Sequence, residues 1–191
     1  MSLSRAFLRA AAASSSFLFA LSLPATAATN EGGSTQVKAQ PGCVNQWLFN
    51  GMWRVRVTKV DFRPAADGYP NAWDVTMQWA NGTTLADLQP ASTGKQDLVL
   101  AFANGDTLAA TATTNGTLIE QKLDYHTFPA SGQYTYTQTF YSGDALDPNN
   151  KPAKLLVTFD VATYKAAHGT KYWTQKTAGY NYRIDLTCDK G

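Results

Sequence analysis

The sequence predicts an all-β domain, folded as a two-sheet sandwich of about seven to nine strands. Apolar and polar residues alternate along most of the chain after residue 43, as in Trp73-Asp74-Val75-Thr76-Met77-Gln78-Trp79. This period of two is that of a strand with one solvated face. Turn-forming Asn-Gly sequences separate several of the alternating runs. The connecting segments are long and uneven, which favours a sandwich over an up-and-down barrel.

The strands follow from this alternation in chain order. The first predicted strand has Val55 and Val57 on one face but Val60 and Phe62 on the other, so we predict a β-bulge near Thr58-Lys59 that resets the register. The later strands are expected at residues 73–79, followed by a tight turn at Asn81-Gly82, then at 98–102 and 108–112 as a hairpin, and at 134–140, 155–159 and 182–188. One short helix is predicted near residues 160–168, capped by Asp160 and ended by Gly169.

Residues 1–28 are typical of a secretory signal peptide. Arg5 and Arg9 precede an apolar, alanine-rich stretch that ends in small residues around Ala27. The stretch is too short and too polar for a typical membrane span, although an N-terminal anchor helix is the alternative. Residues 29–42 are polar and glycine-rich, so we predict a flexible leader there and one folded domain over residues 43–191. We therefore expect a periplasmic or secreted protein without a membrane span after signal removal.

The chain has two cysteines, Cys43 and Cys188, which mark the two ends of the predicted domain. Disulfides persist in oxidising compartments outside the cytoplasm, and two cysteines allow one intramolecular bridge. We predict that Cys43–Cys188 ties the ends together, with a stabilisation of about 5 kcal/mol from chain entropy and of about 2–4 kcal/mol in typical measurements. The nearby Trp47, Phe49 and Trp53 are then predicted to pack beneath this bridge rather than to bind a ligand.

Charge gives no support for a nucleic-acid partner. The chain has 16 Lys and Arg against 14 Asp and Glu, and removal of Arg5 and Arg9 with the signal peptide leaves 14 of each and a net charge of zero. The remaining basic residues are scattered, apart from the alternating Arg54 and Arg56. A nucleic-acid-binding surface normally requires a basic cluster.

Catalytic and metal motifs are scarce. The sequence lacks GxSxG, HExxH, CxxC and a glycine-rich phosphate loop. Glu120 is the single glutamate of the predicted domain, which disfavours the paired carboxylates of a glycoside hydrolase. The oxygen-rich segment 144–150 leaves open a weak calcium site, but Asp, Asn and Pro also dominate ordinary turns. We therefore predict no cofactor and no metal.

The strongest binding candidates are Tyr172, Trp173 and Tyr180, in a polar, glycine-containing segment. Aromatic residues on loops of a rigid β scaffold stack on sugars or anchor protein partners; the alternative is that Trp173 folds back to plug the end of the sandwich. The resulting hypothesis is an exported, non-catalytic binding or surface-interaction module for polysaccharide, cell-wall material or a protein partner. The alternative is a small secreted or periplasmic hydrolase with a site around His126 or His168.

A pattern over residues 53–159 resembles that of a known group of domains. The runs WRVRVTKV, WDVTMQWANGT and LVLAFANGDTL are followed by Phe128-Pro-x-x-Gly132 and YTYTQTF. This order resembles small immunoglobulin-like, telokin-like domains of exported bacterial proteins. The resemblance implies a single antiparallel immunoglobulin-like β-sandwich and brings no established catalytic residues. The chain departs from the pattern at Trp47 and Phe49 and from Val161 onward.

Overall fold

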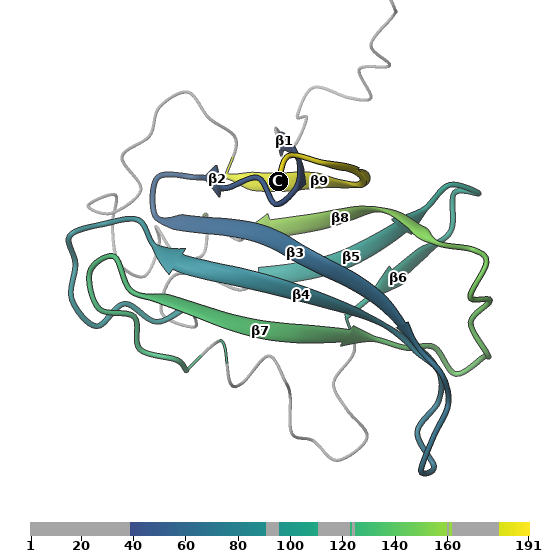
Figure 1. The fold of residues 1–191 in the computed structure, drawn as a ribbon. Helices are drawn as coiled ribbons and strands as arrows, with labels where there is room; N and C mark the ends of the chain where they lie inside the picture. Colours follow the sequence, from purple (N-terminus) through teal and green to yellow (C-terminus); the bar gives the residue numbers. More distant parts are fainter. Residues whose placement is uncertain (1–38, 91–95, 111–122, 124, 160, 162–179) are drawn as a thin grey trace, which may run out of the picture. The chain divides into compact units, whose positions relative to one another are not determined.

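A computed structural model of the chain describes residues 39–90, 96–110, 123, 125–159, 161 and 180–191, which belong to the compact unit Val37–Gly191. The signal peptide, most of the leader and, apart from Val161, the helix predicted near residues 160–168 lie outside the described residues. The described residues form nine strands (Figure 1): β1 (Ala39–Val44), β2 (Leu48–Phe49), β3 (Trp53–Arg63), β4 (Ala72–Asn81), β5 (Gln96–Phe102), β6 (Thr107–Ala109), β7 (Gln133–Phe140), β8 (Pro152–Phe159) and β9 (Asn181–Asp189).

The strands form two sheets, so the predicted β-sandwich is confirmed. One sheet has the order β1-β9-β8-β5-β6 and the other the order β2-β3-β4-β7. In Figure 1 the strands β3, β4 and β7 run alongside one another, and the carboxyl terminus lies beside β1. Tyr182 of β9 joins the sheets, because its hydroxyl donates a 2.7 Å hydrogen bond to the carbonyl of Trp53 in β3.

The core is built from the inward-facing residues of the alternating runs. Trp53, Trp79 and Phe128 are buried at its centre, with ring centroids 5.9 Å apart for Trp53–Trp79 and 5.1 Å for Trp53–Phe128. Both pairs are edge-to-face, the arrangement favoured by the ring quadrupoles. The other members of the core come from both sheets and include Val55, Val57, Val75, Met77, Leu100, Phe140, Leu155, Val157, Tyr182 and Ile184.

The predicted bulge in β3 is confirmed. Val57 lies opposite Met77, but Lys59 lies opposite the next residue, Thr76, so the register shifts at Thr58. The extra residue returns Val60 and Phe62 to the inner face, as the sequence requires. The bulge therefore keeps both halves of a long strand in contact with the core.

The two predicted turns have different outcomes. Strands β5 and β6 form the expected antiparallel hairpin. The expected tight turn at Asn81-Gly82 is wrong, because β4 pairs with β3 and β7 and the chain then crosses to β5 in the other sheet. Asn81 is buried, and its amide instead donates to carbonyls of Leu85, Phe128 and Pro129 at 2.8–3.3 Å.

Two predictions about the start of the domain are corrected. Residues 39–42, expected in the flexible leader, form part of β1, and β1 pairs in parallel with β9 rather than antiparallel. Strand β1 lies at the edge of its sheet, where backbone hydrogen bonds to β9 hold it in place. Its polar composition therefore gives no apolar alternation from which a strand could be predicted. Gly42 also contacts Leu48, whose Cδ atoms lie 2.8 Å from the position that a Cβ at residue 42 would take. A larger residue at position 42 would therefore have to displace the buried Leu48 side chain.

The predicted disulfide is present between Cys43 of β1 and Cys188 of β9. Their Cα atoms lie 5.2 Å apart across a sequence separation of 145 residues. The bridge lies where the β1–β9 register shifts, since Cys43 pairs with Asp185 but Val44 pairs with Asp189. A disulfide is compatible with a periplasmic or extracellular protein. In the described part of the chain, no helix has the length and apolar character needed to cross a bilayer.

Candidate functional site

The outer face of the β2-β3-β4-β7 sheet carries two rows of side chains that run across its strands. The antiparallel registers place Phe49, Arg54, Ala80 and Gln133 opposite one another in the first row. In the second row Arg56, Gln78 and Thr135 are opposite one another. Trp47 precedes β2 and contacts Arg56 of this row. Because alternate residues share a face, the inward-facing Leu48 and Val55 leave these aromatic and basic neighbours on the outside.

Each of the two arginines lies over an aromatic ring. The Arg54 guanidinium carbon is 5.1 Å from the Phe49 ring centroid, and that of Arg56 is 4.8 Å from a ring of Trp47. These distances are within the range of cation–π attraction. Arg56 also donates from Nε to Oε1 of Gln78 at 2.7 Å. Within the described residues, neither arginine forms an ion pair with a carboxylate.

A hollow of about 420 Å³ lies beside these arginines, a size typical of small-ligand sites. Its lining is mainly polar and includes Trp47, Arg54, Arg56, Ala80, Ser131 and Gln133. Ala80 lies between Arg54 and Gln133 in the first row, so its short side chain leaves space between two long ones. Trp47 and Phe49 are half-buried, and Arg54 is exposed. The hollow is therefore open to solvent and bordered by a ring, two cations and neutral polar groups.

Two features at the end of β4 fix the shape of the hollow. A Cβ at Gly82 would lie 2.4 Å from Cε2 of Phe49, so this ring packs directly on the glycine. Ser131 adopts a left-handed backbone conformation with φ 61°, which is uncommon for a residue other than glycine. The hydrogen bonds of Asn81 to Phe128 and Pro129 hold the loop before Ser131 against β4. The site thus rests on buried polar contacts and not on exposed loops alone.

The other end of the same sheet face is organised differently. Arg63 Nε lies 3.0 Å from Oδ2 of Asp74, and Lys59 Nζ lies 2.8 Å from Oδ2 of Asp61. Thr139 of β7 donates a further hydrogen bond of 2.8 Å to Asp74 Oδ1. The basic groups at this end are therefore matched by carboxylates, Lys59 by one of its own strand and Arg63 by one of the neighbouring strand β4.

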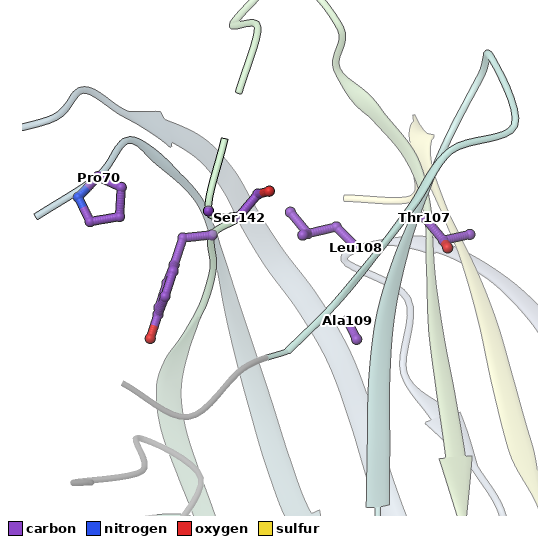
Figure 2. Close-up of a pocket in the computed structure, with 7 residues that line it drawn as sticks. Pro70, Thr107, Leu108, Ala109 and Ser142 are labelled. Carbon is purple, nitrogen blue, oxygen red and sulfur yellow. The ribbon is translucent and has the colours of Figure 1, made fainter. Parts of the chain in front are cut away.

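A second hollow of about 520 Å³ lies near the start of β4 and has a mainly apolar lining. In Figure 2 the side chain of Leu108 points toward Ser142, and Pro70 lies on the far side. An adjoining hollow of about 240 Å³ includes Trp73 and Asp147. Among the described residues, no charged group lines the larger hollow, so they offer little to orient a polar ligand.

The segment 144–150, which the sequence left open as a calcium site, has its Asp147 carboxylate engaged in a turn. Asp147 Oδ1 accepts hydrogen bonds from the backbone N and the side-chain Nδ2 of Asn149 at 2.8 and 3.1 Å. Within the described residues, no three His, Cys, Asp or Glu side chains are grouped to hold a metal ion. These hydrogen bonds explain the Asp and Asn residues of the segment as turn-forming residues.

The predicted binding residues are only partly described. Tyr172 and Trp173 lie outside the described residues, so their role stays a prediction. Tyr180 is half-buried and packs against the core, and its carbonyl accepts a 3.1 Å hydrogen bond from Asn50. The structure does not test its role in binding, and it does not line the hollow beside Arg54 and Arg56.

Of the two histidines considered for a hydrolase, His168 lies outside the described residues. The His126 ring stacks on Tyr134 with centroids 4.0 Å apart and meets the edge of Phe128 at 4.8 Å. Both of these contacts are made by aromatic rings, and neither residue supplies a carboxylate that would orient the imidazole. The hydrolase hypothesis stays untested.

The predicted role of the aromatic cluster is corrected for two of its three members. Trp53 is buried in the core as expected, but Trp47 and Phe49 lie on the outer sheet face over arginines. The sequence contained a signal for this placement. Leu48 separates Trp47 from Phe49, and Val55 separates Arg54 from Arg56, so a hairpin that pairs Leu48 with Val55 sends all four outward.

Two solved structures are similar to this chain at low sequence identity. The structure is similar to an uncharacterised β-sandwich protein from Clostridium difficile 630, with a TM-score of 0.48, 11% identity and coverage of 82% of this chain and 99% of that one. It is also similar to the yjhA protein from Bacillus subtilis, with a TM-score of 0.45, 12% identity and coverage of 76% and 98%. No protein-family model matches the chain, and no curated protein matches it.

Proposed function

We propose that the protein is an exported, non-catalytic module that binds polysaccharide through the hollow bordered by Trp47, Arg54 and Arg56. The observation that carries the proposal is the combination of the half-buried Trp47 ring with a solvent-open hollow of about 420 Å³. Rings on a rigid sheet give a sugar an apolar face to contact. The neutral polar groups of Ser131 and Gln133 at the hollow supply hydrogen-bond partners for hydroxyl groups.

The surface chemistry favours a sugar over a protein partner. A protein-docking surface usually presents a contiguous apolar patch. Within the described residues, the exposed large hydrophobic side chains are Tyr69 and Tyr125 alone. They lie on separate loops, and neither lines the hollow.

Two further parts of the proposal concern the scaffold and the compartment. We infer an immunoglobulin-like, telokin-like sandwich, supported by the sequence pattern over residues 53–159 and by the two-sheet arrangement. Export to the periplasm or the medium is supported by the N-terminal sequence and by the disulfide. Fractionation of producing cells tests export; recovery in the cytoplasm, with the first 28 residues retained, would contradict it.

Affinity gel electrophoresis tests the binding function. The purified protein is run through gels that contain cellulose derivatives, chitin derivatives, mannan, peptidoglycan fragments or uronic-acid polymers. We expect at least one polymer to retard the protein, and Trp47→Ala to remove the retardation. Tyr69→Ala is the matched control, because it removes an exposed aromatic residue elsewhere. Absence of retardation in every gel, or equal retardation of wild type and Trp47→Ala, would overturn the proposal.

A further inference from the structure

We propose that the hollow beside Trp47 selects polysaccharides that carry carboxylate groups, that is, polymers of uronic acids. The inference rests on the proposed polysaccharide-binding function and adds the chemical class of its ligand. It starts from the charges of Arg54 and Arg56, which no protein carboxylate of the described residues neutralises.

The aromatic rings hold the arginines without neutralising them. A ring attracts a guanidinium through its quadrupole and leaves the positive charge in place, whereas a carboxylate would cancel it. The rings meet the guanidinium groups face-on, at 5.1 Å for Arg54 and 4.8 Å for Arg56. A ring in contact with a guanidinium accepts none of its in-plane hydrogen bonds, so N–H donors not used elsewhere stay available to a ligand.

The donors of Arg56 are only partly used within the protein. Its Nε donates to the neutral amide oxygen of Gln78 at 2.7 Å, and this bond fixes the orientation of the guanidinium. The terminal nitrogens of Arg56 have no acceptor among the described residues. Arginine binds a carboxylate through two parallel N–H···O bonds that are stronger than bonds between neutral groups. A carboxylate in the hollow would therefore complete the bonding of Arg56.

The charge of the site suits a uronic acid better than a highly charged polyanion. Alternate residues of one strand lie about 7 Å apart, so Arg54 and Arg56 provide two positive charges within a short span. The other lining groups are neutral, and the next basic residues of this face, Lys59 and Arg63, are paired with carboxylates. A sugar with one charge per ring matches two isolated cations. Dense sulfate or phosphate would need a longer basic track.

Isothermal titration calorimetry with matched ligands tests the inference. The probes are oligosaccharides of polygalacturonate, alginate and hyaluronate, each with its carboxyl-reduced counterpart, which has the same linkage and a hydroxymethyl group in place of the carboxylate. We expect at least one acidic oligosaccharide to bind tenfold or more tightly than its reduced counterpart, because charge-assisted hydrogen bonds are lost on reduction. The difference should shrink at high salt.

Three variants test whether the preference for acidic ligands depends on Arg56. Arg56→Gln should weaken binding of the acidic ligand by about tenfold or more and weaken binding of the reduced ligand much less. Gln78→Glu should act in the same direction, because it gives Arg56 a protein carboxylate that competes with the ligand. Arg63→Gln is the matched control, since it removes a cation of the same sheet face at the end where carboxylates are present, and its affinities should equal those of wild type.

The outcomes separate this inference from the proposed function. Equal binding of acidic and reduced ligands, with loss of both in Trp47→Ala, would overturn the carboxylate selectivity and keep the polysaccharide-binding function. Equal weakening by Arg56→Gln and Arg63→Gln would overturn it in favour of general electrostatic attraction. Binding of no polysaccharide of any kind would overturn both. Circular dichroism of each variant confirms that the measured protein is folded.

Discussion

The two ends of the outer face of the β2-β3-β4-β7 sheet hold their basic residues in different ways. Near the β3–β4 hairpin, Arg63 is paired with Asp74, and Lys59 with Asp61. At the opposite end, Arg54 and Arg56 lie over Phe49 and Trp47. A carboxylate partner fixes an arginine and cancels its charge, whereas an aromatic partner fixes it and leaves the charge available. The charges near the hairpin, at the carboxylate-paired end, are thus cancelled. The opposite, aromatic-paired end keeps two positive charges, which we propose bind a ligand.

Removal of the disulfide should affect the aromatic-paired end most strongly. Cys43→Ser combined with Cys188→Ser should lower the free energy of unfolding by about 2–4 kcal/mol, measured by urea titration. Trp47 and Phe49 follow Cys43 closely in the chain, so loss of the bridge should loosen their segment first. Amide hydrogen exchange should therefore accelerate in residues 43–49 more than in residues 59–76. Reductant added to wild type should reproduce the change. Equal acceleration in both regions would contradict a local tether.

Gly82→Ala should disturb the packing of the Phe49 ring beside Arg54. The new Cβ would lie 2.4 Å from Phe49 Cε2 and 3.1 Å from the carbonyl oxygen of Met52. Overpacking of this kind costs about 1–3 kcal/mol, which thermal unfolding would detect. Gly143→Ala is the control, because no atom lies within 4 Å of its added Cβ; similar losses in the two variants would show that the close approach of Phe49 is unimportant.

Tyr182→Phe tests the contact that holds the start of β3, next to Arg54, to the other sheet. Loss of the hydrogen bond to the Trp53 carbonyl should lower the free energy of unfolding by about 1–2 kcal/mol at pH 7. Burial raises the pKa of Tyr182 well above its ordinary value, with a backbone hydrogen bond from Asn50 opposing this shift. Above about pH 10 the unfolded chain therefore releases the tyrosine proton while the folded chain retains it, and stability falls as pH rises. Urea titrations from pH 8 to 11 should show a steeper loss for wild type than for Tyr182→Phe; parallel curves would exclude this contribution.

Asp74→Asn should have the smallest effect and should be confined to the carboxylate-paired end. The side chains of Arg63 and Asp74 are 42% and 20% exposed, so the ion pair should contribute no more than about 1 kcal/mol. The stability difference from wild type should shrink at high salt, and polysaccharide affinity should not change. A fall in affinity as large as that of Arg56→Gln would remove the distinction between the two ends.

Much of the fold could be predicted from local patterns. Alternation located the β4 residues Trp73 to Trp79, and the break in alternation at Thr58 located the bulge. The disulfide followed from the presence of two cysteines at the ends of the patterned region. The parallel pairing of β1 could not be predicted in this way, because its Gln40-Pro41-Gly42 segment has no apolar alternation, and its stability comes from backbone bonds to a strand that is distant in sequence.

The candidate site was hidden for a related reason. Composition alone marks Trp47 and Phe49 as core residues, since large aromatic side chains are usually buried. Their placement depends on the pairing of β2 with β3, which brings Phe49 opposite Arg54. The small Ala80 at the centre of the first row gives no sequence signal of its own. Cross-strand register, not residue type, brings the site together.

The parallel pairing of β1 with β9 also sets the order in which the domain can be completed. In the described chain, the first strand pairs only with the last. During synthesis, β1 has no strand partner among the described strands until β9 has been made. Contacts of such large sequence separation slow folding, because the entropy of loop closure is lost before they form. The Cys43–Cys188 bridge can therefore form only after β9 has been made, so it reports that the first and last described strands have come together.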